Sequence, residues 1–119
     1  MKNIKRESVQ GYPEVIRRLP EADIPFEGVR AWILQAAESQ LVFCEFEAGI
    51  KVPLHSHVYA QWGMVIDGEM ELTIDGKPLN CKKGTEYVIP AGAKHSAKFL
   101  SHTRVMDYFS EKNRYKPKT

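Results

Sequence analysis

The chain has 119 residues, of which 43% are hydrophobic, and its 17 lysines and arginines are nearly balanced by 15 aspartates and glutamates. This length suits one domain with its own core and is too short for two domains of ordinary size. The net charge of +2 argues against binding to nucleic acid or to an anionic membrane, because both partners call for a strongly basic surface.

The start of the chain is polar and lacks the apolar centre of a signal peptide. No apolar run in the sequence approaches the roughly 20 residues that span a bilayer. We therefore expect a cytoplasmic protein. Cys44 and Cys81 are isolated in the sequence, so we expect buried, reduced packing residues and not metal ligands or nucleophiles.

Residues 1–28 are predicted to form an irregular N-terminal arm, because they are interrupted by Pro13, Pro20 and Pro25. Only the segment from Glu14 to Leu19 has a composition that allows a helical turn. The arm also carries apolar side chains that need cover, namely Val15, Ile16, Leu19, Ile24 and Phe26. A partner subunit would supply that cover, so we expect a homodimer.

From residue 29 onward the chain consists of short apolar or alternating runs separated by turn residues, a pattern typical of β-strands. Residues 29–119 are therefore predicted to form an all-β unit, either a small barrel or a two-sheet jelly roll. The expected strands are Val29–Ala36, Leu41–Glu47, Gln61–Ile66, Glu69–Ile74, Leu79–Lys82, Glu86–Ile89, Ser96–Leu100 and Arg104–Phe109.

Two dipeptides, Asp67-Gly68 and Asp75-Gly76, have the composition of two-residue turns that close tight hairpins. The run Glu69–Ile74 between them alternates regularly between polar and apolar residues. We expect its apolar side chains to point inward, namely Met70, Leu72 and Ile74.

A cluster of metal-ligand side chains lies at His55, His57 and Gln61, and His95 follows much later. If residues 55–61 are extended, the even spacing directs these side chains to one face of a strand. A turn before His95 would let a hairpin bring its ring to the same face. Taken alone, the first two histidines fit a surface strand as well as they fit a metal site.

The spacing of histidines and glycines over residues 49–95 resembles the two motifs of the cupin superfamily. The first motif is seen in Gly49, His55, His57, Gln61 and Gly68, and the second in Gly84, Pro90-Ala91-Gly92 and His95. Cupins usually have Glu at the position of Gln61. The resemblance implies a double-stranded β-helix, which is a jelly-roll barrel, with a metal held by His55, His57, Gln61 and His95.

Three imidazoles and an amide oxygen suit a divalent transition metal, whether zinc, nickel, iron, manganese or cobalt. With Gln61 in place of Glu, all four ligands are neutral, so the metal keeps its full charge. Such a site would attract a small anionic substrate and act as a Lewis acid. The missing anionic ligand makes dioxygen chemistry less favourable, although an anionic substrate would compensate.

Alternation along Thr103–Phe109 places Asp107 on the same face as Val105 and Phe109. If that face is the core, Asp107 is a buried carboxyl and a candidate proton carrier. The alternative is an aspartate at the rim that pairs with Arg114 or Arg104. Tyr59, between the ligand positions, is a candidate for the mouth of the pocket.

The ending Asp107-Tyr108-Phe109-Ser110, followed by Arg114, is similar to that of the small cupin of pectin and alginate breakdown that linearises unsaturated uronates. This resemblance implies catalytic roles for Asp107 and Arg114 and contact of Phe109 with the substrate. We therefore expect a metal-dependent isomerase or lyase acting on a sugar-like or carbonyl anion. The alternatives are a cupin dioxygenase and a sugar-binding or sensing cupin without enzymatic activity.

Overall fold

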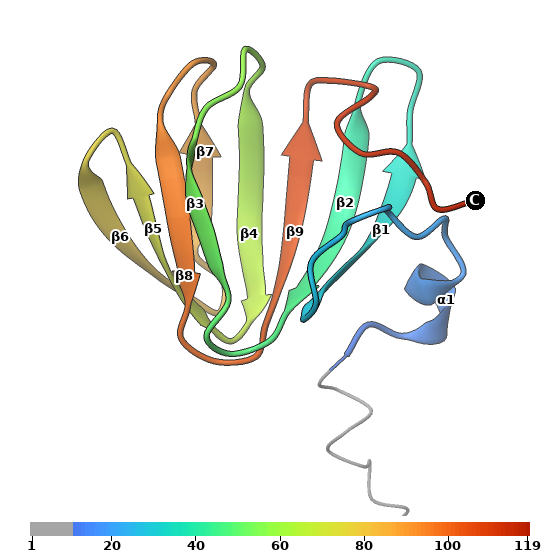
Figure 1. Ribbon diagram of the computed structural model, residues 1–119, viewed down its shortest axis with the longest axis horizontal. Helices are drawn as coiled ribbons and strands as arrows, with labels where there is room; N and C mark the ends of the chain where they lie inside the picture. The colour runs from blue at the N-terminus through green and yellow to red at the C-terminus, as the bar shows by residue number, and fades with distance from the viewer. Residues whose placement is uncertain (1–10) are drawn as a thin grey trace, which may run out of the picture.

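The computed structural model describes residues 11–119, which form two antiparallel β-sheets packed face to face (Figure 1). Their elements are α1 (Glu14–Arg17), β1 (Val29–Gln35), β2 (Gln40–Phe46), β3 (Lys51–His55), β4 (Gln61–Asp67), β5 (Glu69–Ile74), β6 (Lys77–Lys82), β7 (Glu86–Ile89), β8 (His95–Phe99) and β9 (Thr103–Phe109). The prediction of an all-β jelly roll is confirmed.

One sheet has five strands in the order β1-β2-β9-β4-β7, and the other has four in the order β3-β8-β5-β6. The core lies between them, because alternate side chains of the central strands point inward. In the five-stranded sheet Val42, Val65 and Val105 are almost completely buried. In the four-stranded sheet Met70 and Leu72 are buried, as the alternation of β5 predicts.

Strand β3 was not among the strands expected from the sequence, because Pro53 in its centre removes a backbone donor. The structure explains why this proline is tolerated. Within residues 11–119, β3 is the edge of its sheet and pairs only with β8, so one side of the strand needs no partner for its backbone.

The two predicted turns have different outcomes. Asp75 and Gly76 both have positive φ, 48° and 81°, and close the β5-β6 hairpin as expected. The hairpin expected at Asp67-Gly68 is wrong, because β4 and β5 belong to different sheets and the chain crosses from one to the other there. Gly68 has a φ of 91°, and an added Cβ would collide with the backbone of His102 and Thr103.

The described part of the arm, residues 11–28, packs against its own sheet. The Tyr12 hydroxyl donates a 2.6 Å hydrogen bond to the carbonyl of Val105, and its ring contacts the rings of Trp32 and Phe43. Further along, the backbone N–H of Ala22 donates to the carbonyl of Ala31 in β1. Helix α1 is a single turn within the predicted segment. Residues 1–10 of the arm lie outside the described residues.

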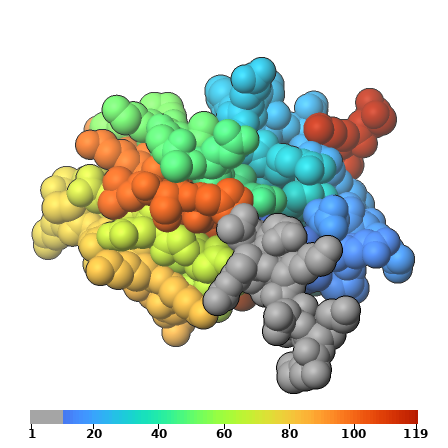
Figure 2. Space-filling model, turned by 90° about the horizontal axis from the view of Figure 1, so that it is seen from below, coloured from blue at the N-terminus to red at the C-terminus, as the bar shows by residue number. Residues whose placement is uncertain are grey.

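One end of the sandwich is closed by the β2-β3 connection and the β8-β9 connection, which are far apart in the sequence (Figure 2). Gly49 donates a backbone hydrogen bond to Phe99, and Phe99 donates one back to Ile50. The rings of Phe46 and Phe99 stack with centroids 3.8 Å apart at this end. The loop that joins β3 to β4 lies at the opposite end (Figure 1).

Cys44 and Cys81 are buried free cysteines, as expected. Between residues 11 and 119, no helix has the length and apolar character needed to cross a membrane.

Candidate metal centre

Three histidine rings converge at the open end of the sandwich. β3 ends at His55 and β8 begins at His95, and these two residues are directly paired across the sheet. His57 follows in the loop. One ring nitrogen of each histidine lies within 4.8 Å of the others, so the three could hold a metal ion.

The route by which the chain brings these residues together differs from the prediction. Residues 55–61 do not form one extended strand: β3 ends at His55, β4 begins at Gln61 in the other sheet, and the chain bends in between. His95 likewise arrives by a crossing between sheets and not by a hairpin. A backbone hydrogen bond of 2.7 Å from Gly92 to His57 ties the two crossing segments together.

Each histidine ring is oriented by the backbone. In all three, Nδ1 lies 2.8–2.9 Å from a carbonyl oxygen two residues away, namely that of Pro53 for His55, Tyr59 for His57 and Ala93 for His95. Because a carbonyl only accepts, Nδ1 carries the proton and the lone pair remains on Nε2. A ring that donates from one nitrogen to a carbonyl and keeps the other nitrogen free is typical of histidines that bind metals.

Gln61 adds an oxygen to this set. Its Oε1 lies 3.2 Å from Nε2 of His57, and in the tautomer described above both atoms are acceptors. Two lone pairs facing each other are best satisfied by a cation between them. The amide group of Gln61 also interacts with Asp107, whose pKa it lowers by hydrogen bonding. The donor set therefore fits a divalent metal held by three imidazoles and one amide oxygen.

Burial lowers the pKa of His95, and the nearby His55 and His57 rings add to that shift. The ring is thus biased toward the neutral form, which is the form that binds a metal.

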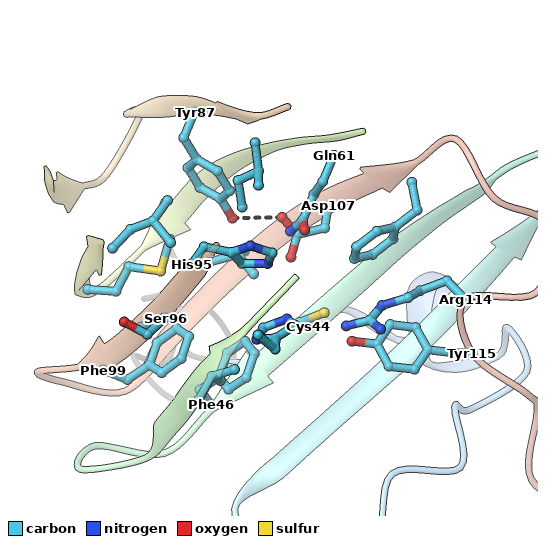
Figure 3. A pocket seen from close by; sticks show the side chains of 18 residues that line it. Cys44, Phe46, Gln61, Tyr87, His95, Ser96, Phe99, Asp107, Arg114 and Tyr115 are labelled. Carbon is cyan, nitrogen blue, oxygen red and sulfur yellow. Dashed lines mark hydrogen bonds between the residues drawn. The ribbon is translucent and has the colours of Figure 1, made fainter. Parts of the chain in front are cut away.

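Asp107 is buried beside this set, on the inward face of β9 together with Val105 and Phe109. Its Oδ1 accepts a 2.7 Å hydrogen bond from the hydroxyl of Tyr87 (Figure 3). Burial raises the pKa of Asp107 to about 6, although hydrogen bonding to Tyr87 and Gln61 opposes the shift. The carboxyl can therefore gain and lose a proton near neutral pH.

The alternative of a rim salt bridge for Asp107 does not match the geometry. Arg104 pairs with Asp67 at 3.0 Å on the outer side of the sheet. Arg114 lies over the ring of Phe109, with its Cζ 5.1 Å from the ring centroid, and over Tyr115 at 4.8 Å. The Nε atom of Arg114 is buried and has no hydrogen-bond partner among the described residues.

The pocket between these groups has a volume of about 80 Å³. Most of its wall is apolar, including Phe46, Val52, Met70, Leu72, Ile89, Phe99 and Phe109. Figure 3 shows Tyr87 and Arg114 on opposite sides of the pocket. Tyr59 is not part of the wall: its ring stacks on His57, with centroids 4.3 Å apart, and thus supports a ligand position from behind.

Two residues of the site were not anticipated from the sequence. Tyr87 points inward from β7, and alternation with the buried Ile89 would have revealed its direction. Gly63 is the cross-strand partner of both Tyr87 and Asp107. An added Cβ at Gly63 would collide with both side chains, so only glycine leaves room for their hydrogen bond.

A family model described as a cupin domain matches residues 42–109. The chain belongs to the cupin family. The resemblance seen in the two histidine motifs is therefore confirmed. Quercetin 2,3-dioxygenase from Bacillus subtilis is 37% identical over 76 residues, which cover 62% of this cupin and 23% of that protein. The cupin thus spans less than a quarter of the length of this curated relative.

Several solved structures share the fold. KdgF from Halomonas sp. superposes with a TM-score of 0.71 at 24% identity, covering 78% of this cupin and 86% of that chain. An RmlC-like cupin from Shewanella frigidimarina gives 0.74 at 23% identity, covering 82% and 87%. A salicylate 1,2-dioxygenase from Pseudaminobacter salicylatoxidans gives 0.68 at 15% identity, covering 72% and 27%. At these identities the likeness concerns the fold alone.

Proposed function

We propose that this cupin is an enzyme that uses a Lewis-acidic divalent metal on a small anionic substrate, sugar-like or carbonyl, in an isomerase or lyase type of reaction. The observation that carries the proposal is the buried carboxyl of Asp107, held by Tyr87 next to the ligand set. A carboxyl in such a place is costly to bury, and active sites are where this cost is usually met.

The proposed metal ligands are His55, His57, His95 and Gln61. A divalent ion of zinc, nickel, iron, manganese or cobalt bound there would supply Lewis acidity toward a substrate oxygen. All four ligands are neutral, so no ligand would compensate the ion's charge, and this charge would favour an anion.

Asp107 is the proposed proton carrier. Its pKa of about 6 allows it to accept a proton from the substrate and return it at another atom near neutral pH. Tyr87 holds the carboxyl in place with its 2.7 Å hydrogen bond. Arg114 would pair with the anionic group of the substrate, because its Nε is buried at the pocket and has no partner among residues 11–119. Phe109 would contact the substrate from its place under Arg114.

The similarity of the chain's ending to the uronate-linearising cupin suggests the first substrate to test. Metal-loaded protein is incubated with unsaturated galacturonate, and ring opening is followed against the spontaneous reaction. We expect acceleration by the wild type, a large loss in Asp107→Asn and no loss in Glu38→Gln, which alters an exposed acidic residue. No rate above the spontaneous one would remove this substrate, and full activity of Asp107→Asn would remove its assigned role.

A second candidate is a dioxygenase, favoured by the 37% identity to quercetin 2,3-dioxygenase. The apolar wall of the pocket, with Phe46, Phe99 and Phe109, also suits an aromatic substrate. Anaerobic loading with ferrous iron, followed by oxygen uptake in the presence of a flavonol, tests it. Uptake that depends on the flavonol would favour this function over isomerisation.

We also infer a homodimer that forms through the outer face of the five-stranded sheet. One cross-strand row on this face is apolar on all five strands: Leu34, Leu41, Tyr108, Trp62 and Val88. The row beside it is apolar as far as Met64, but its Trp32 and Phe43 lie under Tyr12 of the arm. Val88 is 60% exposed and Leu34 48%. A row of partly or largely exposed apolar side chains that crosses five strands is typical of an interface.

A second copy of the chain is the partner that we propose for this face. Five strands about 4.8 Å apart and about seven residues long give roughly 500 Å² in projection. The arm covers the part over Trp32 and Phe43, so the contact would be smaller than the roughly 800 Å² that each partner of a standard interface buries.

Sedimentation velocity tests the interface. The wild type should be a dimer and Val88→Glu a monomer, whereas Val15→Glu, at another exposed valine, should stay dimeric. A chain that lacks residues 1–10 should also stay dimeric. If that truncation alone gives monomers, the arm predicted from the sequence is the interface instead. The cytoplasmic location stays a prediction.

A further inference from the structure

A second pocket adjoins the candidate metal centre and has a volume of about 520 Å³. It lies between the arm segment Asp23–Glu27, strand β2 and the start of β3. No pairing among residues 11–119 joins β3 to β1 or β2, so the two sheets are not hydrogen-bonded on this side. The arm covers the gap only in part, because Phe26 at the pocket remains 68% exposed.

The lining of the second pocket is mainly apolar, with side chains from three segments that are distant in sequence, such as Ile24, Phe26, Val29, Ile50 and Val52. Its acidic residues, Asp23 and Glu27, are matched in number by Lys51 and Arg114. Several hydroxyls of a sugar ring would have no hydrogen-bond partner against such a wall, and burying an unpaired hydroxyl costs binding free energy. An aromatic or aliphatic group would be stabilised there by burial.

The two pockets share a wall made of Cys44, Phe46, Val52, Arg114 and Tyr115. Arg114 is the only cationic side chain in that wall. Its guanidinium is flanked by the rings of Phe109 and Tyr115, and its buried Nε lacks a partner among the described residues. A planar guanidinium held in this way is suited to a carboxylate. A carboxylate bound here would have the metal centre on one side and the apolar pocket on the other.

We propose that the second pocket binds the apolar body of the substrate, so that the substrate is a carbonyl or hydroxy carboxylic acid with an aromatic or aliphatic substituent. Its carboxylate pairs with Arg114 and its substituent lies among Ile24, Phe26 and Ile50. This inference rests on the proposed function of the adjoining metal centre and narrows the proposed substrate class from sugar-like or carbonyl anions to carbonyl and hydroxy acids.

Equilibrium binding of straight-chain carboxylates, from acetate to octanoate, tests the proposal without any turnover. The probes are titrated calorimetrically into the full-length protein loaded with zinc. Burial of a methylene group contributes about 0.8 kcal/mol, which corresponds to roughly fourfold in Kd. We expect Kd to fall by up to this factor for each carbon until the pocket is filled, and phenylpyruvate to bind at least tenfold more tightly than pyruvate. A Kd independent of chain length would overturn the proposal.

Variants locate the binding site. Phe26→Ser, at an exposed position that the fold tolerates, should weaken octanoate severalfold and leave acetate unchanged. Val15→Ser, at the equally exposed valine of the same arm, should change neither. Arg114→Met should weaken all the acids by a similar factor. If Phe26→Ser and Val15→Ser behave alike, the apolar group binds elsewhere and the proposal fails.

The outcome can be separated from that of the proposed function. Absence of both ring opening and oxygen uptake would remove the proposed activities but leave the dependence of Kd on chain length intact. Conversely, rapid turnover of unsaturated galacturonate together with a flat chain-length series would retain the activity and refute the second pocket as a substrate site.

Discussion

Replacement of Asp107 by asparagine should stabilise the metal-free protein, and the gain should grow with pH. The wild-type carboxyl has a pKa of about 6 in the folded chain against 3.8 as its ordinary value, because it is buried. Between these two values the folded chain binds more protons than the unfolded chain, so stability falls as the pH rises. Above pH 6 nearly the whole penalty is present, about 3 kcal/mol for a shift of this size. Asparagine has no such penalty.

The assay is urea unfolding of both chains in the presence of a chelator, followed by tryptophan fluorescence. The titration of other groups cancels in the difference between the two chains. This difference should increase by about 2 kcal/mol between pH 4.5 and pH 7.5, in favour of Asp107→Asn. Tyr87→Phe removes a hydrogen bond that lowers the pKa of Asp107. In this variant the loss of stability caused by ionising Asp107 should therefore continue to a higher pH than in the wild type.

A difference that does not change with pH would refute the reasoning, because Asp107 would then titrate alike in the folded and unfolded chains. A change of opposite sign would mean that the folded chain stabilises the ionised carboxyl, most directly through Arg114, which lowers the pKa of Asp107.

Three further predictions concern the site. Zinc or nickel at 100 times its Kd should stabilise the protein by about 2.7 kcal/mol in thermal unfolding; His95→Ala should abolish this effect, whereas His102→Ala, at an exposed loop histidine, should retain it. Gly63→Ala should lower stability by about 1–3 kcal/mol through overpacking, and a normal melting temperature would contradict the tight contact with Asp107. Gln61→Glu should bind the metal more tightly and small carboxylates more weakly in calorimetry, because it adds a negative charge; unchanged carboxylate binding would contradict the electrostatic argument.

The parts of the site that depend on local spacing could be predicted from the sequence. The spacing of His55, His57 and His95 indicated a cupin, and simple alternation in β9 placed Asp107 on the inward face. The loop after His55 could not be predicted, because it depends on β3 and β4 belonging to different sheets. The same limit applies to Asp67-Gly68, which looks like Asp75-Gly76 in sequence but connects strands of different sheets.

The roles of Gly63 and Tyr87 could not be predicted, because they depend on how strands distant in sequence pair with one another. Gly63 matters only because β7 and β9 flank β4 and bring Tyr87 and Asp107 to either side of it. Strand order of this kind is set by pairing between distant segments, which a reading of alternation in one strand cannot supply. The second pocket could not be predicted for the same reason, because its wall comes from the arm, β2, the start of β3 and two residues after β9, Arg114 and Tyr115.

The hydrogen bonds from the three histidine rings to backbone carbonyls affect how the protein would acquire its metal. With each ring already fixed by Pro53, Tyr59 or Ala93, ion entry requires no rearrangement of the rings. A rigid neutral site of this kind follows the common affinity order of the first-row metals and does little to select among them by charge. The ion that occupies it in the cell should then reflect supply, so the same chain isolated under zinc-rich or iron-rich growth would differ in activity without differing in fold.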